Sequence, residues 1–380
     1  MRFTIKREEF LKGLSTASRA IASNVALAVL ANLKIELDEN GLFITGSNSD
    51  LTIKTLVPYK NDNVEVIRNY KEGGILIQAK ILTEAVRRME SEEVTLDVVD
   101  STIATLSDSR SNYRLNCIRV EEYPDIDLEA NGTELVLSKD DFNALVSQTA
   151  FAASVKDQRP ILTAIHLAAG DGILAQPGIL VAVASDASRV AYKQIKIDPE
   201  VRFVANVPAK FMTEVNRLAE GCETLDVSFG DKKALFAVGR SIIATRLIAG
   251  DYPKVESVLR QATSYRLEIN ASELLKSIDR VTILSEERQN PVTMIINDEF
   301  VEITARSSKV GSATERIDVF KYEGQNISRT FNSEFVAGAL KALNAEDVTF
   351  DFPSDEKRAF VIKNVSDDST IQVVSAMRSA

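Results

Sequence analysis

Side chains that could carry out catalysis are few in this 380-residue sequence. The single histidine, His166, lies in "TAIHLAA", whose alternating pattern predicts a strand, and we expect a structural role for it. Cys117 and Cys222 have no second histidine to pair with and no metal-binding spacing. The motifs HExxH, GxxxxGK[ST] and GxGxxG do not occur. These residues predict no catalytic centre, no metal site and no cofactor.

Carboxylates occur in short runs, such as "VRRMESEE" at 86–93. A run of this kind more often ends a helix in solvent than forms an active-site pair, because catalysis needs acids and bases in fixed positions. A metal-dependent hydrolase built on carboxylates therefore stays open as an alternative. Turnover that depends on a divalent metal would support it.

The overall charge is acidic, with 45 Lys and Arg against 55 Asp and Glu and a net charge of −10. Such a body repels nucleic acid and anionic membranes, so any contact with nucleic acid must be local. The amino terminus lacks the apolar core of a signal peptide, and the apolar run at 25–33 is too short to span a bilayer. With no disulfide framework either, we expect a cytoplasmic, soluble protein without a membrane partner.

A helical pattern recurs three times, as "REEFLKGLSTASRAI" (7–21), "KDDFNALVSQTAFAA" (139–153) and "ASELLKSIDRVTIL" (271–284). The anchors Phe10, Phe142 and Leu274 follow one another at intervals of 132 residues. A second helical pattern recurs at 79–89, 209–219 and 333–343, and alternating strands with short turns surround both patterns. A period this long indicates repeated domains. We predict an α+β chain of three domains, 1–128, 129–260 and 261–380, each with two helices and about eight antiparallel strands.

Basic residues recur at matching positions opposite the apolar stripes of these helices. One basic helix face is usually an ordinary solvated surface, but recurrence in an acidic chain favours a shared positive surface. Its natural partner is the phosphate backbone of duplex DNA, contacted without reading sequence. No aromatic residues interleave with the charges, which argues against stacking on single strands. The nine expected DNA-facing residues are Lys12, Arg19, Lys80, Arg87, Lys210, Arg217, Lys276, Arg280 and Lys341.

Five segments in order carry a resemblance to a known family: 1–14, 149–167 ("TAFAASVKDQRPILTAIHL"), 181–192 ("VAVASDASRVAY"), 247–259 ("LIAGDYPKVESVL") and 371–379 ("IQVVSAMRS"). With them the sequence resembles the bacterial DNA polymerase III beta subunit, the sliding clamp, along its whole length. The resemblance implies a non-catalytic processivity factor. It also implies a head-to-tail homodimer closed into a ring around duplex DNA, with helices lining the hole and sheets outside. By position, Tyr113, Ile283 and Leu284 correspond to the dimer interface.

The resemblance further implies an apolar pocket between the second and third domains. Replicative polymerase, clamp loader, repair polymerases and mismatch-repair proteins would bind there through short peptides with one or two large apolar side chains. The expected pocket residues are Arg159, Leu162, Ser185, Arg189, Val190, Pro253, Val258, Val373, Met377 and Arg378.

The sequence departs from the family pattern at several of these places. Ser188, Ser257, Ser375 and Ala376 stand where larger or basic residues are common, so we expect a smaller-walled, less basic pocket with altered peptide preference. Asn24 stands where a DNA-contacting basic residue is usual. A clamp-like peptide-binding scaffold that never encircles DNA stays open as a second alternative, and failure to dimerise would favour it.

Overall fold

A computed structural model describes residues 1–21, 27–100, 102–156, 158–172, 174–284, 290–318 and 321–377. The chain divides into two compact units. The first unit contains Met1–Lys139 and Glu214–Leu247, and the second contains Asp140–Thr213 and Ile248–Ala380. The middle repeat thus contributes to both units.

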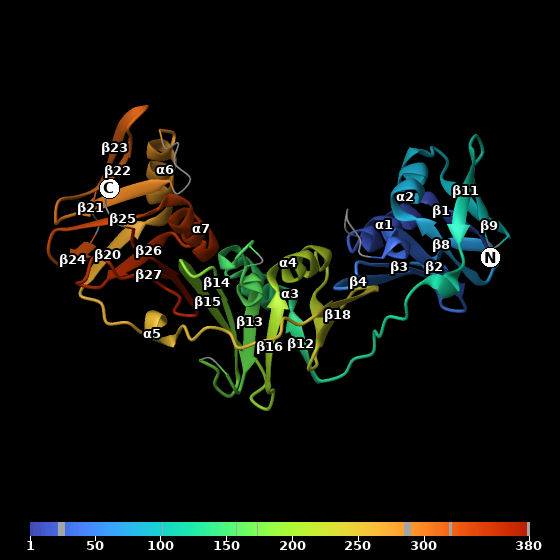
Figure 1. Cartoon of the computed structure of the whole chain (residues 1–380), viewed down its shortest axis with the longest axis horizontal. Helices are drawn as coiled ribbons and strands as arrows, with labels where there is room; N and C mark the ends of the chain where they lie inside the picture. The colour runs from blue at the N-terminus through green and yellow to red at the C-terminus, as the bar shows by residue number, and fades with distance from the viewer. Residues whose placement is uncertain are drawn as a thin grey trace. The chain divides into compact units, whose positions relative to one another are not determined.

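Both predicted helical patterns are confirmed in all three repeats. The helices are α1 (Arg7–Ser18), α2 (Ala79–Arg88), α3 (Lys139–Ser147), α4 (Ala209–Leu218), α6 (Ala271–Thr282) and α7 (Ser333–Leu343), and a short α5 (Glu256–Leu259) lies between the repeats (Figure 1). The helix α3 ends earlier than its pattern suggests, because Thr149 leaves the helical region at φ −128° and its hydroxyl donates back to the Leu145 carbonyl. The 3₁₀ turn η3 (Ala150–Ala152) continues the chain from there.

The first unit contains a 13-stranded antiparallel sheet with the order β12-β17-β18-β19-β4-β3-β2-β8-β11-β10-β9-β1-β7. Pairing of β19 with β4 carries this sheet from the middle repeat into the first. The strands are β1 (Arg2–Lys6), β2 (Asn32–Asp38), β3 (Gly41–Ser47), β4 (Leu51–Val57), β7 (Ile67–Lys71), β8 (Gly73–Gln78), β9 (Glu93–Asp100), β10 (Ile103–Ser107), β11 (Asn112–Ile118), β12 (Thr133–Ser138), β17 (Thr224–Phe229), β18 (Lys233–Val238) and β19 (Ser241–Arg246).

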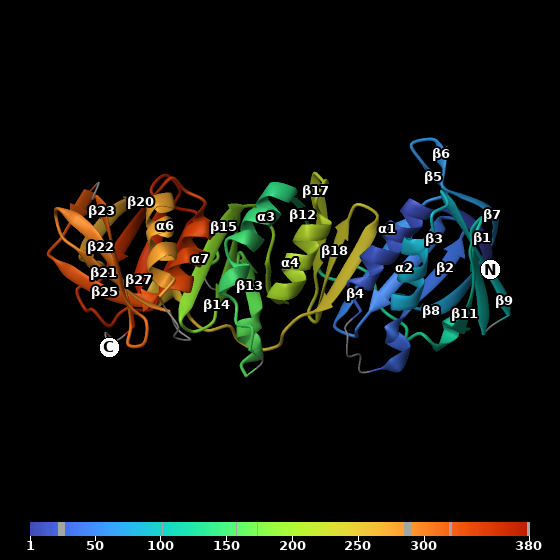
Figure 2. The same cartoon turned by 90° about the horizontal axis from the view of Figure 1, so that it is seen from above.

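The helices α1 and α2 lie side by side against this sheet (Figures 1 and 2). Phe10 of α1 is fully buried and meets Phe3 of β1 edge to face at 5.7 Å. Gly46 of β3 permits the close approach of α1, because a Cβ there would lie 2.2 Å from the Ala17 carbonyl oxygen. The apolar stripe read from the sequence is therefore the buried face of α1.

The second unit contains a nine-stranded sheet with the order β16-β13-β14-β15-β28-β27-β26-β20-β24 and a four-stranded sheet with the order β23-β22-β21-β25. Pairing of β15 with β28 joins the middle and third repeats. The strands are β13 (Ala164–Ala169), β14 (Ile179–Ser185), β15 (Arg189–Lys196), β16 (Phe203–Pro208), β20 (Tyr265–Asn270), β21 (Pro291–Ile296), β22 (Phe300–Ser307), β23 (Gly311–Asp318), β24 (Lys321–Glu323), β25 (Ile327–Asn332), β26 (Asp347–Phe352), β27 (Phe360–Asn364) and β28 (Thr370–Val374).

The first repeat has more strands than expected. It contains eleven strands within the described residues, because the segment after β4 folds into a short hairpin, β5 (Lys60–Asn61) and β6 (Val64–Glu65), before β7. Asp62 and Asn63 make the turn of this hairpin in the left-handed region. Asn69 has the same backbone conformation within β7, where the pairing with β1 is irregular. No helix in the described part of the chain is long and apolar enough to cross a membrane.

Candidate functional site

The nine basic residues expected to face DNA are all exposed. They lie on five helices, α1, α2, α4, α6 and α7, except for Arg19, which directly follows α1. On α2 the opposite face is buried through Leu82, Ala85 and Val86. The helices therefore have the apolar and basic faces that the spacing predicts.

Three of the nine cations are paired with carboxylates. Arg19 Nη1 donates to Glu214 Oε1 at 3.0 Å, and Arg87 pairs with Glu84 one turn away. Arg280 donates to both oxygens of Glu315, at 3.0 and 2.8 Å. This paired hydrogen bond raises the pKa of Arg280 and lowers that of Glu315. Lys12, Lys80, Lys210, Arg217, Lys276 and Lys341 form no ion pair within the described residues.

The expected partner pocket is centred on one face of the nine-stranded sheet. Val190 of β15 lies opposite Val373 of β28 and opposite Ser185 of β14, so these three side chains share a face. Val190, Val258 and Val373 belong to one apolar cluster, together with Tyr252 and Val255. The structure thus places the three valines of the expected pocket in one apolar cluster.

Other expected residues lie on the segments around this cluster. Leu162 is buried in the 3₁₀ turn η4 (Pro160–Thr163), and the exposed Arg159 precedes that turn. Pro253 is exposed beside Tyr252, while Met377 is half-buried and its N–H donates to the Thr330 carbonyl at 2.7 Å. Arg378 and Asn24 lie outside the described residues.

Arg189 points to the other face of the sheet from Val190, as neighbours on a strand must. Its guanidinium lies 5.4 Å from the ring centre of Phe151 and 4.6 Å from that of Phe335. Its Nε donates to Asp186 Oδ2 at 3.0 Å. The alternation of side chains along a strand already predicts that Arg189 and Val190 lie on opposite faces, so the sequence alone could have excluded Arg189 from the apolar cluster.

Tyr252 and Val255 are pocket-cluster residues that the sequence analysis did not name. Both are buried, at 6% and 4% exposure. A signal was present, because "GDYPKV" shares its Tyr-Pro pair with "EEYPDI" at the end of the first repeat, where Tyr123 is also buried.

Two of the unusual serines flank the pocket strands. The Ser188 carbonyl accepts from Ser375 N at 2.9 Å, which ties the turn before β15 to the residue after β28. Ser257 is exposed on α5, and Ala376 is half-buried. The altered peptide preference that these residues suggest stays a prediction.

The residues expected at the dimer interface are accessible to different degrees. Ile283, at the end of α6, is 79% exposed and Tyr113 on β11 is 38% exposed, while Leu284 is half-buried. Only Cys117 and Ile118 of β11 pair with β8 in the described structure, so the first part of β11 has a free edge. In the second unit, β23 is an edge strand of its sheet.

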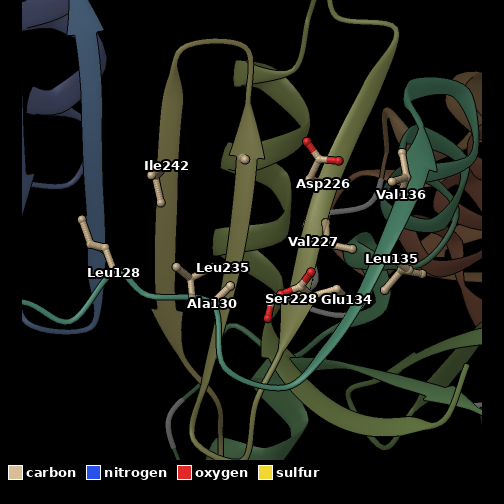
Figure 3. A pocket seen from close by; sticks show the side chains of 11 residues that line it. Leu128, Ala130, Glu134, Leu135, Val136, Asp226, Val227, Ser228, Leu235 and Ile242 are labelled. Atoms are coloured by element: carbon tan, nitrogen blue, oxygen red, sulfur yellow. The ribbon is translucent and has the colours of Figure 1, made fainter. Parts of the chain in front are cut away.

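A separate pocket of about 330 Å³ lies in the first unit, against β12, β17, β18 and β19. Apolar side chains such as Leu235 and Ile242 line it, and the linker carrying Leu128 and Ala130 runs across the strands (Figure 3). None of the expected site residues lines this pocket. All described residues of the expected partner pocket belong to the second unit instead.

His166 is buried on β13, which fits the structural role expected for it, and its Nδ1 lies 2.8 Å from Asn206 Oδ1. Across the described ranges, no three His, Cys, Asp or Glu side chains are grouped to hold a metal ion.

Comparison with known proteins shows the family of the chain and favours neither the metal-dependent hydrolase nor the scaffold that only binds peptides. Models of the N-terminal, central and C-terminal domains of the DNA polymerase III beta subunit match residues 1–127, 136–254 and 256–378. The chain belongs to this family. It therefore has three α+β clamp domains, and the expectation of a non-catalytic processivity factor is confirmed, because that is what the family is.

Individual relatives agree over their full lengths. The beta sliding clamp of Halalkalibacterium halodurans is 28% identical, with all of both chains covered. The crystal structure of the Bacillus subtilis sliding clamp matches with a TM-score of 0.94 at 25% identity, again over all of both chains. A Pseudomonas aeruginosa clamp solved bound to griselimycin shares the fold, with a TM-score of 0.90 and 22% identity over all of both chains.

Proposed function

We propose that this chain acts as a DNA sliding clamp, in which two copies close into a ring around duplex DNA and hold DNA polymerase III at its template. The observation that carries the proposal is the full-length match to three successive beta subunit domains. The ring is a tether: it raises the effective concentration of polymerase at the primer end without any catalysis. The family itself implies partnership with DNA and with the polymerase.

Contact with DNA is proposed to run through the exposed basic faces of the helices. The six cations without a carboxylate partner in the described structure are the strongest candidates, since each can neutralise a phosphate. Arg19, Arg87 and Arg280 would contribute less, because Glu214, Glu84 and Glu315 already offset their charge. Weak contacts to phosphate carry no sequence information, which suits a ring that slides.

Closure of the ring is proposed to be head to tail. Each copy would use the free edge of β11 with Tyr113 on one side, and β23 with Ile283 and Leu284 on the other. Two different surfaces make a heterologous contact, and such contacts form a finite ring when the rotation closes. The free edges of β11 and β23 support this pairing.

The apolar cluster around Val190, Val258 and Val373 is proposed as the pocket for partner peptides. Replicative polymerase, clamp loader, repair polymerases and mismatch-repair proteins would each insert one or two large apolar side chains there. We also propose domain boundaries at 128/129 and 260/261 and a cytoplasmic location, where replication takes place.

Primer extension tests this function directly. A DNA polymerase III core with its clamp loader and ATP would copy a primed single-stranded circle with and without this chain. The proposal expects products of thousands of nucleotides from a single binding event with the chain, and short products without it. Equal product lengths in both reactions would overturn it.

A further inference from the structure

The only histidine of the chain forms a buried polar pair with an asparagine. His166 on β13 and Asn206 on β16 lie directly opposite one another, with 3% and 9% exposure. Asn206 Nδ2 donates to the Gly250 carbonyl at 3.0 Å, so Asn206 Oδ1 is the acceptor for His166 Nδ1–H at 2.8 Å. The hydrogen bonds therefore run from His166 through Asn206 to Gly250.

This chain of hydrogen bonds ties down the segment that enters the pocket cluster. Besides the Gly250 bond, the N–H of Ile248 donates to the Asn206 carbonyl at 2.9 Å. Asn206 thus holds the segment at two points, two and four residues before Tyr252. The His166 ring also stacks on Tyr252, with centroids 5.0 Å apart and planes 23° from parallel.

Tyr252 connects this network to the proposed peptide pocket. It packs in the cluster that contains Val190, Val258 and Val373. The register of the sheet places His166 opposite Val183, and Val183 opposite Tyr192, so all three lie on the face that carries the cluster. The polar pair and the pocket therefore share one layer of side chains.

We propose that His166 and Asn206 are positioning residues for partner binding: they hold the segment from Ile248 to Tyr252 in the one arrangement that gives the pocket its shape. The inference rests on the proposed pocket. An apolar pair would fill the same space, but the directional hydrogen bonds from His166 through Asn206 to Gly250 allow one geometry and so fix the backbone from Ile248 to Tyr252.

The same network makes the arrangement sensitive to acid. His166 Nε2 has no hydrogen-bond partner within the described residues, so protonation would place a buried, unpaired N–H there. Burial accordingly lowers the pKa of His166, while the Asn206 hydrogen bond and the Glu256 carboxylate oppose that shift. The other titratable group packed against the ring is Tyr252, whose pKa is raised by burial. The neutral form supports the network, so peptide affinity should hold near neutral pH and fall as pH drops through the lowered pKa.

The test measures affinity and stability together, with a fluorescein-labelled pentapeptide ending in Leu-Phe as the probe and the unlabelled pentapeptide as a competitor. Asn206→Leu leaves His166 Nδ1–H and the Gly250 carbonyl unpaired and should weaken probe binding roughly tenfold. The double variant His166→Leu/Asn206→Leu removes the unpaired imidazole N–H and leaves only the Gly250 carbonyl unpaired, so unfolding stability should recover in part while affinity stays low. A packing role alone predicts that both recover, which would overturn the proposal.

Ser47→Ala serves as the matched control. It removes the hydrogen bonds of a buried hydroxyl in the other compact unit, to Thr52 Oγ1 at 2.8 Å and to the Leu51 carbonyl and the Ser49 N–H at 3.2 Å each. This variant should lower stability and leave affinity unchanged. The wild-type chain gives a second readout that needs no variant. Its single histidine has one ¹³Cε1–H NMR signal, which should shift on probe binding and titrate below about 6.5.

The outcomes separate the two proposals. If the wild-type chain does not bind the labelled pentapeptide, the proposed pocket is wrong and the positioning role is wrong with it. If it binds, but the histidine signal does not move and the variants bind within twofold of wild type, the pocket stands and the positioning role is wrong.

Discussion

Replacing Ile283 should weaken the dimer without weakening the fold. Ile283 is 79% exposed in the single chain, so its side chain contributes little to the stability of one copy. Burying an isoleucine side chain completely is worth about 1.5–3 kcal/mol. Scaled by the exposed fraction, burial of Ile283 at an interface would contribute roughly 1.2–2.4 kcal/mol.

A closed dimer contains two such interfaces, so Ile283→Ser removes this contribution twice. The expected reduction in dimer stability is roughly 2.4–4.8 kcal/mol, which raises the dimer dissociation constant on the order of 50- to 3,000-fold. Sedimentation velocity over a nanomolar-to-micromolar dilution series measures that dissociation constant. The melting temperature of the monomer measures the stability of the fold.

Val365→Ser provides the comparison, because Val365 is 48% exposed and lies outside the proposed interface. It should leave both the dissociation constant and the melting temperature unchanged. The placement of Ile283 at the interface is wrong if Ile283→Ser dissociates at the same concentration as wild type, or if Val365→Ser weakens the dimer to the same extent.

Three further predictions concern DNA, the pocket and pH. Lys80→Ala should reduce the slope of log affinity for duplex DNA against log salt concentration by about 0.9 for each phosphate that is no longer neutralised. Arg280→Ala should reduce this slope less, because Glu315 already offsets the charge of Arg280. Filter binding over a range of salt concentrations measures both slopes, and equal reductions would contradict the offset of Arg280 by Glu315. Val258→Ser should weaken binding of the labelled pentapeptide several-fold, since it removes an apolar side chain from the cluster. A dissociation constant that is unchanged in fluorescence anisotropy titrations would contradict the placement of the pocket at this cluster. Asp108 accepts hydrogen bonds from the backbone N–H groups of Arg110 and Ser111, and these bonds lower the pKa of Asp108 to about 2. The stabilising effect of the carboxylate is therefore present above about pH 4 and is lost as pH falls toward 2. Asp108→Asn should flatten the pH dependence of the free energy of urea unfolding in that range.

The repeated helices were predictable because their signal is local. The apolar stripe of Phe10, Leu14 and Ala17 lies within three turns of one helix, so a short segment of sequence is enough to predict it. All three residues are buried in the structure. The early end of α3 was not predictable from the stripe, since Ala152 and Ala153 continue its apolar character. A single change of backbone angle at Thr149 ends the helix.

Partners that are distant in sequence explain what the sequence analysis missed at the site. Arg19 and Glu214 are separated by 195 positions, so helix spacing predicts an exposed cation but not its neutralisation. The structural role of His166 followed from its strand, whereas its partner Asn206 depends on the register between β13 and β16. Registers are set by the packing of the whole sheet, which no short segment encodes.

Encirclement of DNA distinguishes a sliding clamp from a scaffold that only binds peptides, and a topological assay measures it. The chain would be loaded onto nicked circular duplex by a bacterial clamp loader with ATP, and free protein would be removed in moderate salt. Half of the sample would then be cut with a restriction enzyme. A ring held by topology stays on the circles and slides off the linear ends. Equal dissociation from circular and linear DNA would contradict encirclement and favour the scaffold.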